Sequence, residues 1–338
     1  MLNILFCSEG LREARRALVS ELPDHNVIAC SPGDVGDALR ETSIDVLVPS
    51  MARIDTDIMG AGRFGLIQQF GVGLEGVDVR AATDAGIWVA NVPAAGFGNA
   101  DSVAEHVLMF MLALSRRLPR MKDDLAARRI SEPAGQALFG KTACIIGLGD
   151  IGVEIARRLV PFRMRILAVR RRPEQGAPPE AGVESVYGMA ELEQVLGQSD
   201  YAILCAPLTA DTRHMIDRET LSWMKRGSYL INVARGGLVD QDALLDALQS
   251  EHLAGAGLDV FWEEPVDPDC ALLACNVIAT PHVAGLTDSA CAGIALTVAD
   301  NIRRYAKGEA PQFAVNAPRM PRRLLIDGLI GGNGVSRN

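Results

Sequence analysis

Short apolar runs alternate with amphipathic stretches of helical length along most of the chain. The clearest runs lie at residues 4–6, 46–48, 87–89, 143–146, 166–169, 202–205, 229–233 and 277–279. This alternation is typical of βαβ units, in which a helix carries the chain from one parallel strand to the next. The pattern therefore predicts an α/β fold of doubly wound parallel sheets.

Two longer stretches with helical periodicity stand out from this rhythm. One covers residues 101–118, with Asp101 or Ser102 as its N-cap. The other covers about 287–307 and is ended by Gly308. We expect a hinge between two domains near the ends of these helices.

The section between the two helices is long enough for a complete nucleotide-binding domain. We expect this domain, residues 99–284, to be inserted into a discontinuous substrate-binding domain made of residues 1–98 and 285–338. Two domains also suit the length, because 338 residues exceed the size at which a single core usually stops growing. Residues 317–338 contain two prolines and a glycine cluster and are expected to form an irregular tail.

Composition narrows the class of protein. A formal net charge of -9 offers no basic surface for phosphates, so nucleic acid is not expected as a partner. The seven cysteines are scattered and never spaced C-x-x-C, which favours neither a disulfide framework nor a metal site. The longest apolar run, 107–114, is far shorter than the roughly 20 residues that span a bilayer. With no signal-peptide pattern at the N-terminus, we expect a cytoplasmic protein without a membrane partner.

A glycine-rich turn follows the apolar run at 143–146. Gly147, Gly149 and Gly152 form a G-x-G-x-x-G motif, and an amphipathic stretch continues after it. Between a strand and a helix, the first glycine permits a tight turn, the second lets the backbone approach a pyrophosphate, and the third lets the helix pack on the sheet. The motif predicts a dinucleotide site, whose contacts we expect at Gly147, Leu148, Gly149, Asp150, Ile151 and Gly152.

Arginines occupy the position where NAD enzymes usually carry an acidic residue. That residue lies about 20 positions after the glycines and binds the ribose 2′-hydroxyl. Here Arg170 stands there, followed by Arg171 and Arg172. Guanidinium groups bind phosphate oxygens, so NADP is favoured over NAD; a solvated basic turn is the alternative. The loop after the next run is a further candidate for cofactor contact, or a plain turn; its residues are Ala206, Pro207 and Thr212.

Three later segments place single polar residues at strand ends, where the active sites of α/β proteins gather. They are INVARGG with Arg235, GLDVFWEEP with Asp259 and Glu264, and TPHVAG with His282. Together with GLGDIG and the closing stretch NIRRYAKGEAPQFAVN, these segments resemble the D-isomer-specific 2-hydroxyacid dehydrogenases. That family includes glyoxylate/hydroxypyruvate reductases, D-lactate dehydrogenases and phosphoglycerate dehydrogenases.

The resemblance covers nearly the whole chain up to about residue 316. It implies two Rossmann-like or flavodoxin-like lobes, with Arg235, Glu264 and His282 as the catalytic set and Asp259 near the nicotinamide amide. Family members usually dimerise through the nucleotide-binding domain, so a homodimer is expected. On the cofactor side, the same strand ends add Val233, Ala234, Arg235, Asp259 and His282 to the expected contacts.

The chemistry of 2-oxo acid reduction explains these residue types. Arg235 supplies a forked, permanently charged donor for the substrate carboxylate and carbonyl. His282 can give and take a proton near neutrality, and Glu264 beside it would favour the protonated imidazole. We therefore expect reduction to be lost as pH rises.

Another glycine-rich segment, residues 70–78, resembles the family's substrate loop. Backbone N–H groups of Gly73 and Leu74, next to Val72, would bind the substrate carboxylate together with Arg235 and His282. The ordinary reading of the same residues is a strand-to-helix turn. The connection at 91–105 is about three residues longer than in typical members, which leaves the size of the substrate open.

The other four histidines lack such context, and His106 is expected to face the packing between domains. The leading hypothesis is NADPH-dependent reduction of a small 2-oxo acid, such as glyoxylate or hydroxypyruvate, to the D-2-hydroxy acid. One alternative is an NAD-linked dehydrogenase of a larger D-2-hydroxy acid such as phosphoglycerate. Another is a dinucleotide-sensing protein similar to the corepressor branch of the fold. The physiological substrate and the direction of reaction stay open.

Overall fold

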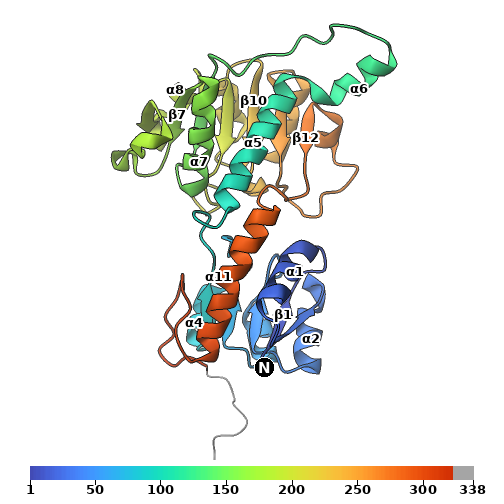
Figure 1. The fold of residues 1–338 in the computed structure, drawn as a ribbon. Coiled ribbons are helices and arrows are strands. Elements are labelled where there is room, and N and C mark those ends of the chain that lie inside the picture. The colour runs from blue at the N-terminus through green and yellow to red at the C-terminus, as the bar shows by residue number, and fades with distance from the viewer. Residues whose placement is uncertain (323–338) are drawn as a thin grey trace, which may run out of the picture. The chain divides into compact units, whose positions relative to one another are not determined.

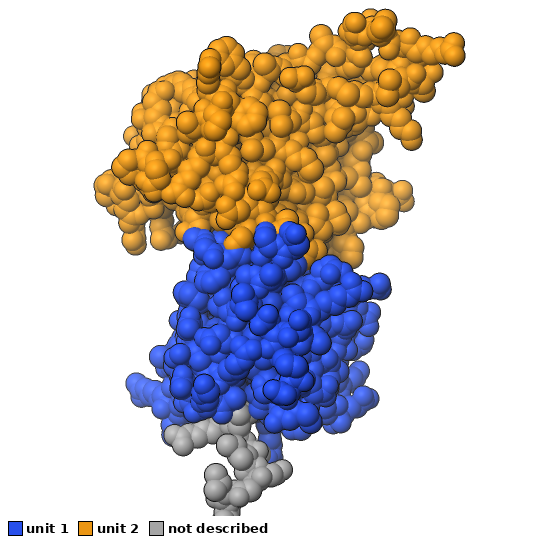
Figure 2. All heavy atoms as spheres, in the orientation of Figure 1, with its two compact units in different colours: residues 1–97, 288–338 blue, residues 98–287 orange. Residues whose placement is uncertain are grey.

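The computed structural model describes residues 1–322 (Figure 1). The chain forms two compact units, coloured separately in Figure 2. Unit 1 comprises Met1–Phe97 and Asp288–Asn338, and unit 2 comprises Gly98–Thr287. The assignment of unit 2 to a dinucleotide and of unit 1 to a substrate is a proposal taken up below.

The described residues of unit 1 form a five-stranded sheet and five α-helices. Its strands are β1 (Asn3–Phe6), β2 (Asn26–Ala29), β3 (Val46–Val48), β4 (Leu66–Gln68) and β5 (Trp88–Ala90). Its helices are α1 (Arg12–Glu21), α2 (Val35–Glu41), α3 (Thr56–Ala61), α4 (Val79–Asp84) and α11 (Asp288–Ala306), with a 3-10 turn η1 (Pro32–Asp34). All neighbouring strands are parallel, in the order β2-β1-β3-β4-β5, which is a doubly wound, flavodoxin-like order.

The period-2 pattern of the strands decides which helices cover each face of this sheet. Leu5, Leu47 and Ile67 point to one face, where they form a core with buried side chains of α2, α3 and α4. Helices α1 and α11 contact each other, and α11 also contacts β4. Both faces of the parallel sheet are therefore packed by helices.

Unit 2 contains a seven-stranded sheet. Its strands are β6 (Thr142–Ile146), β7 (Arg165–Val169), β8 (Ser185–Tyr187), β9 (Tyr201–Leu204), β10 (Ser228–Asn232), β11 (Leu253–Leu258) and β12 (Val277–Ala279). Its helices are α5 (Asn99–Ser115), α6 (Leu118–Ala126), α7 (Asp150–Leu159), α8 (Leu192–Leu196), α9 (Arg218–Trp223) and α10 (Gln241–Gln249). Short 3-10 turns are η2 (Val160–Phe162), η3 (Pro173–Gln175), η4 (Pro179–Ala181), η5 (Met189–Glu191), η6 (Gly236–Leu238) and η7 (Ala271–Ala274).

All strands of the unit 2 sheet are parallel, in the order β12-β11-β10-β9-β6-β7-β8. The order reverses between β6 and β9, which defines the switch point where α/β proteins bind ligands at the carboxyl ends of their strands. The predicted α/β class with doubly wound parallel sheets is confirmed in both units.

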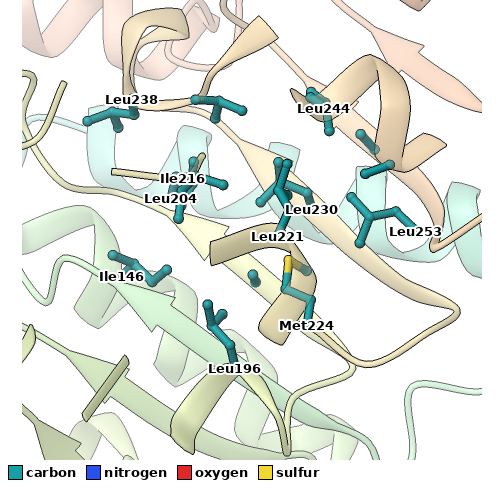
Figure 3. Packing of buried hydrophobic residues seen from close by; sticks show 14 of the residues in the cluster. Ile146, Leu196, Leu204, Ile216, Leu221, Met224, Leu230, Leu238, Leu244 and Leu253 are labelled. Carbon is teal, nitrogen blue, oxygen red and sulfur yellow. The ribbon is translucent and has the colours of Figure 1, made fainter. Parts of the chain in front are cut away.

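Successive residues of the unit 2 strands point to opposite faces of the sheet and belong to two separate hydrophobic cores. Ala143 and Ile145 lie in the core under α5 and α7, which stand in front of the sheet in Figure 1. Their neighbours Cys144 and Ile146 lie in the core of the opposite face, covered by α8, α9 and α10. Figure 3 shows this second core, in which Ile146 and other strand residues meet leucines of the helices. The sheet is thus buried on both faces, and polar residues at its strand ends stand out.

The first long helix differs from its prediction at both ends. Helix α5 begins at Asn99 after Gly98, which has a φ of +79°, so neither Asp101 nor Ser102 is the N-cap. The helix ends at Ser115, and α6 starts at Leu118. Pro119 explains the break, because it lacks the N–H that a continuing helix needs and fits the first turn of a new one.

The second long helix, α11, agrees with its prediction. It runs over Asp288–Ala306, and Gly308 follows in the left-handed region with a φ of +76°. Residues 317–322 form no helix or strand, as expected, but the Arg322 guanidinium donates hydrogen bonds to the carbonyl oxygens of Ala85, Gly62 and Phe64. The remainder of the expected tail lies outside the described residues. Within residues 1–322, none of the helices is long and apolar enough to cross a bilayer.

Candidate active site

The glycine motif forms the turn between β6 and α7. Gly147 has a φ of +100°, and a Cβ there would lie 2.5 Å from the amide nitrogen of Ala206. A Cβ at Gly152 would lie 2.4 Å from the carbonyl oxygen of Gly147, so both glycines are needed for close backbone packing. Around Gly149 nothing lies within 4 Å of a Cβ position, and no side chain caps the helix that begins there. This open helix N-terminus fits an anion such as a pyrophosphate.

The arginine cluster lies at the end of β7, beside the glycine turn. The Arg170 guanidinium donates to the carbonyl oxygen of Gly176 at 2.9 Å and to Gln175 Oε1 at 2.6 Å. These bonds hold the loop that follows the strand. Arg171 and Arg172 are exposed. The cluster therefore presents positive charge at the strand end where a ribose is expected in this fold.

The loop after β9 is closed by its own hydroxyl groups. Thr212 Oγ1 donates to the carbonyl oxygen of Pro207 at 2.7 Å and accepts from the Thr209 amide at 2.8 Å. Ala206 is nearly buried against the glycine turn. The loop is thus held in one conformation beside the glycine turn between β6 and α7. This position is compatible with contact to a cofactor.

Arg235 follows β10 in a turn that a buried asparagine organises. The Asn232 side chain accepts a hydrogen bond from the Ala234 amide at 3.0 Å and donates to the Arg235 carbonyl oxygen at 2.9 Å. The Arg235 guanidinium donates to the Ala234 carbonyl oxygen at 2.6 Å. Val233 and Ala234 are buried, so packing and hydrogen bonds together hold this turn in place.

The Arg235 turn packs directly on the segment that leads to Glu264. A Cβ at Gly236 would lie 2.2 Å from the carbonyl group of Phe261, which only glycine avoids. Close backbone contact therefore couples the end of β10 to the segment after β11. The arginine and the glutamate come from different strand ends but from one packed unit.

Glu264 and His282 are in hydrogen-bond contact, as the sequence led us to expect. Glu264 Oε2 lies 2.7 Å from His282 Nδ1, and Oε1 accepts a hydrogen bond from the Phe261 amide at 2.9 Å. The side chains are 23% and 34% exposed, so the pair is reachable from solvent. Because Nδ1 is engaged by the carboxylate, Nε2 is the nitrogen that can exchange a proton with a substrate.

The electrostatics of Glu264 bring Arg235 into the same site. Burial opposes ionisation of the carboxyl group, but the hydrogen bonds from His282 and the Phe261 amide, with the charges of His282 and Arg235, hold its pKa below the ordinary value. Glu264 is therefore ionised near neutral pH. The three residues of the predicted catalytic set influence one another within unit 2.

The backbone at His282 is held in an unusual conformation by Asp259. His282 has a φ of +55°, in the left-handed region that non-glycine residues rarely adopt. The Asp259 carboxylate, which is buried, accepts from the Val283 amide at 2.8 Å and from the Ala284 amide at 2.9 Å. The Asp259 carbonyl oxygen also accepts from the His282 amide at 2.8 Å. Asp259 thus anchors the turn that presents the imidazole; its expected contact with nicotinamide stays a prediction.

His106 is bonded within unit 2, and the expectation that it faces the packing between domains stays a prediction. Its Nε2 lies 2.9 Å from Thr280 Oγ1, and its ring meets Phe110 edge-on at 4.6 Å. From the sequence alone, a histidine on an apolar helix can face solvent, a neighbouring helix or strand, or a buried polar group. Only the tertiary contact distinguishes these.

In the glycine-rich loop of unit 1, residues 70–78, two carbonyl groups accept hydrogen bonds from side chains of the same unit. The Asn91 side chain donates to the Val72 carbonyl oxygen at 2.8 Å, and the Gln69 side chain donates to the Gly73 carbonyl oxygen. In a trans peptide the N–H points opposite to the C=O, so the Gly73 and Leu74 amides point away from these partners. Binding of a substrate carboxylate by these two amides stays a prediction.

Several residues that shape these turns were not singled out from the sequence. They are polar side chains at strand ends, buried at Gln69 and Asn232 and half-buried at Asn91 and Thr280. A polar residue directly after an apolar run was the available signal. Within residues 1–322, no three His, Cys, Asp or Glu side chains gather in a group that could hold a metal ion.

Comparison with known proteins agrees with this geometry. The family model for the D-isomer specific 2-hydroxyacid dehydrogenase NAD binding domain matches residues 108–284. A glyoxylate reductase of Pyrococcus furiosus is 38% identical over 286 residues, which cover 81% of this chain and 82% of that protein. The apo structure of D-lactate dehydrogenase from Escherichia coli aligns with a TM-score of 0.79 at 26% identity, over 93% of this chain and 100% of that one.

A plant relative matches more of this chain but less of itself. D-3-phosphoglycerate dehydrogenase 2 of Arabidopsis thaliana is 33% identical over 332 residues, which cover 96% of this chain and 51% of the relative. This chain therefore spans about half the length of that relative. Relatives named for two different substrates match at similar identity, so the comparisons indicate a family and leave the substrate open.

Proposed function

The chain belongs to the D-isomer specific 2-hydroxyacid dehydrogenase family, and from that premise we propose that it reduces a small 2-oxo acid to the D-2-hydroxy acid with a nicotinamide dinucleotide. The observation that carries the proposal is the Glu264–His282 pair at 2.7 Å, with the Arg235 charge acting on the same carboxylate. A cation, a proton donor and a fixed carboxylate are the groups that this reduction requires.

Each side chain has a defined task. Arg235 binds the substrate carboxylate and polarises the neighbouring carbonyl, which its planar, permanently charged fork suits. His282, protonated on both nitrogens, donates the Nε2 proton to the forming hydroxyl while Nδ1 stays bonded to Glu264. Glu264 stabilises the imidazolium before the transfer and fixes its orientation.

The cofactor is proposed to lie along the carboxyl end of the unit 2 sheet. Its pyrophosphate would be held by the turn from Gly147 to Gly152, where the open position above Gly149 fits close approach of phosphate oxygens. When bound there, the nicotinamide supplies the hydride. The remaining contacts proposed for it are Ala206, Pro207, Thr212, Val233, Ala234, Asp259 and His282.

NADP is the proposed cofactor in preference to NAD. The support is the position of Arg170 at the end of β7 with exposed Arg171 and Arg172 beside it. No carboxylate stands at position 170 to accept from a ribose hydroxyl or to repel a 2′-phosphate. The hydrogen bonds from Arg170 to Gln175 and Gly176 pre-organise the loop around it.

A small substrate such as glyoxylate or hydroxypyruvate is proposed first. The relative from Pyrococcus furiosus is named a glyoxylate reductase and matches most of its own length. In unit 1, the amides of Gly73 and Leu74 are proposed to bind the substrate carboxylate. The carbonyl oxygens of the same two peptide groups accept hydrogen bonds from the Asn91 and Gln69 side chains, and these bonds fix the direction in which the amides point. A larger D-2-hydroxy acid such as phosphoglycerate is the second candidate, supported by the Arabidopsis relative.

A panel assay tests the proposal. Oxidation of NADPH and of NADH is followed at 340 nm with glyoxylate, hydroxypyruvate, pyruvate and 3-phosphohydroxypyruvate as substrates. Turnover of a small 2-oxo acid supports the proposed function, and turnover of the phosphorylated acid alone favours the second candidate. Tight cofactor binding without turnover on any substrate contradicts reduction and favours a dinucleotide-sensing role.

A homodimer paired through α5 is proposed as the assembly. The support is two exposed apolar side chains on this helix, since Met109 is 44% exposed and Leu112 is 37% exposed. Light scattering on the purified protein, with a Leu112→Glu variant as comparison, would test it. A monomeric wild type would contradict it.

A further inference from the structure

We propose that His106 and Thr280 are positioning residues for the proton donor. With Asp259 they form a partly buried hydrogen-bond chain that holds the turn carrying His282 in the conformation in which its imidazole meets Glu264. The kinetic consequence of this inference rests on the proposed function. Its structural consequence does not, because it concerns contacts within unit 2 alone.

The chain joins three separate elements. His106 lies on α5, Thr280 directly follows β12, and Asp259 directly follows β11. His106 Nε2 lies 2.9 Å from Thr280 Oγ1, which in turn lies 2.6 Å from Asp259 Oδ1. The direct distance from His106 Nε2 to that carboxylate oxygen is 3.8 Å, so the threonine hydroxyl makes the connection.

The direction of every proton in this chain is determined. The Thr280 hydroxyl donates its single hydrogen to Asp259 Oδ1. The threonine oxygen can then only accept from His106, whose Nε2 must carry the hydrogen. This fixes the tautomer of a neutral His106 with its proton on Nε2.

The surroundings of His106 keep it neutral. Burial lowers the pKa of its imidazole, and the negative charge of Asp259 only partly opposes that effect. The side chain is 14% exposed, and the edge-on contact with Phe110 covers one side. A neutral donor satisfies Thr280 without placing a second buried charge beside the carboxylate.

Backbone packing brings α5 close enough for this contact. A Cβ at Gly257 in β11 would lie 2.7 Å from the ring of Phe110, so only glycine lets the helix approach the strand this closely. Phe110 stands one helical turn after His106, on the same face. The short strand-to-helix distance therefore places the imidazole over the end of the neighbouring strand.

The chain matters because the His282 turn depends on the orientation of one carboxylate. Both oxygens of Asp259 are used by the amides of Val283 and Ala284, and His282 itself is in the left-handed region. Rotation of the carboxylate would break both amide contacts together. Thr280 blocks that rotation from one side, and His106 fixes the rotamer of Thr280. The left-handed backbone at His282 is maintained by this set of contacts.

Paired variants test the inference, with steady-state kinetics over pH 5.5–9.5. Thr280→Val keeps the shape and removes the hydroxyl, while Thr280→Ser restores it; His106→Leu removes the donor, while His106→Gln retains a side-chain N–H near the position of Nε2. We expect Thr280→Val and His106→Leu to lower kcat roughly 10-fold or more, with a smaller change in KM. The serine and glutamine variants should stay within about 3-fold of wild type. His25→Gln, which removes a half-buried histidine of unit 1, is the control.

The pH profile distinguishes positioning from a merely structural role. If the variants only lost folded protein, kcat would fall while the shape of its pH profile stayed unchanged. Loosening of the His282 turn weakens its contact with Glu264, so the alkaline limb of the profile should move to lower pH in Thr280→Val and return in Thr280→Ser. An unchanged limb in both valine and leucine variants would overturn the inference.

Hydrogen exchange gives a readout that needs no activity. The Val283 and Ala284 amides, which bond to Asp259, should exchange roughly 10-fold faster or more in Thr280→Val, while amides of β6 keep their wild-type protection. Equal protection of residues 283 and 284 in wild type and variant would overturn the inference. Failure of the wild type to reduce any 2-oxo acid would instead remove the proposed function, and the exchange experiment would still decide the positioning role.

Discussion

Replacing Glu264 by glutamine should shift the pH dependence of reduction while leaving the site assembled. Its Oε2 lies 2.7 Å from His282 Nδ1, and the two side chains are 23% and 34% exposed. Unit charges about 4 Å apart interact by about 4 kcal/mol near a protein surface and by about 1 kcal/mol in bulk water. Partial exposure places this pair between those limits, at about 2 kcal/mol. Since about 1.4 kcal/mol corresponds to one pH unit, the alkaline limb should move down by about 1.5 units.

The hydrogen bonds of Glu264 explain why a glutamine at this position should change the protonation of His282. Oε1 accepts from the Phe261 amide at 2.9 Å, so the glutamine oxygen must keep that place and turn its NH₂ group toward His282. An NH₂ donor favours the imidazole with an unprotonated Nδ1, which is the form that cannot hold the extra proton. Both the lost charge and the reversed donor therefore act in the same direction.

The assay is kcat/KM for reduction of the best 2-oxo acid between pH 5.5 and 10. Glu263→Gln is the matched control, because it removes the same charge from the exposed neighbouring residue. We expect the control to keep the wild-type profile. A Glu264→Gln profile that superimposes on both would refute the assignment of Glu264 as the partner of the proton donor.

Three further variants test other parts of the site. Arg235→Gln should lower kcat/KM roughly 10²-fold or more, because loss of an oriented charged donor removes transition-state stabilisation, while cofactor affinity measured by fluorescence titration should change less than about 3-fold. Arg170→Asp should reverse the preference from NADPH to NADH, measured as the ratio of the two kcat/KM values; an unchanged ratio would remove the argument for NADP. Burial lowers the pKa of His106, so the unfolded chain binds a proton there more readily than the folded one; stability is therefore full above about pH 6.5 and declines as pH falls through the lowered folded value. His106→Gln should flatten that decline in urea midpoints measured at pH 7.5 and 5.5, and an equal decline in both proteins would contradict it.

The fold could be predicted because a strand that is buried in a parallel sheet is a short, continuous apolar run in the sequence. When such runs alternate with helix-length amphipathic stretches, few other structures fit the pattern. Residues 46–48 form a strand at the predicted position, and the predicted run 166–169 lies within β7. Helix ends were harder, because they depend on single peptide groups. Gly98 takes the N-cap position of α5 although two good capping residues follow it, and the break before Pro119 divides what periodicity alone presents as one helix.

The candidate site could be predicted only as far as its chemistry is carried by distinctive residues. Glycines of the phosphate turn and the Glu264–His282 pair lie where strand ends converge, and the resemblance supplied their spacing. Asn232 and Thr280 could not be assigned roles, because a buried hydroxyl or amide is informative only when its partner is known. Those partners lie on other strands and helices, and a linear pattern does not pair them.

The most direct test of the central claim is the effect of His282→Gln on reduction and on cofactor binding in the same preparation. If His282, held by Glu264 beside Arg235, is the proton donor, kcat for the best 2-oxo acid should fall by roughly 10²–10⁴-fold, while the dissociation constant of the reduced cofactor, for which His282 is one of several proposed contacts, should change by less than about 10-fold. A variant that reduces the substrate at close to the wild-type rate, with the same pH profile, would contradict the account.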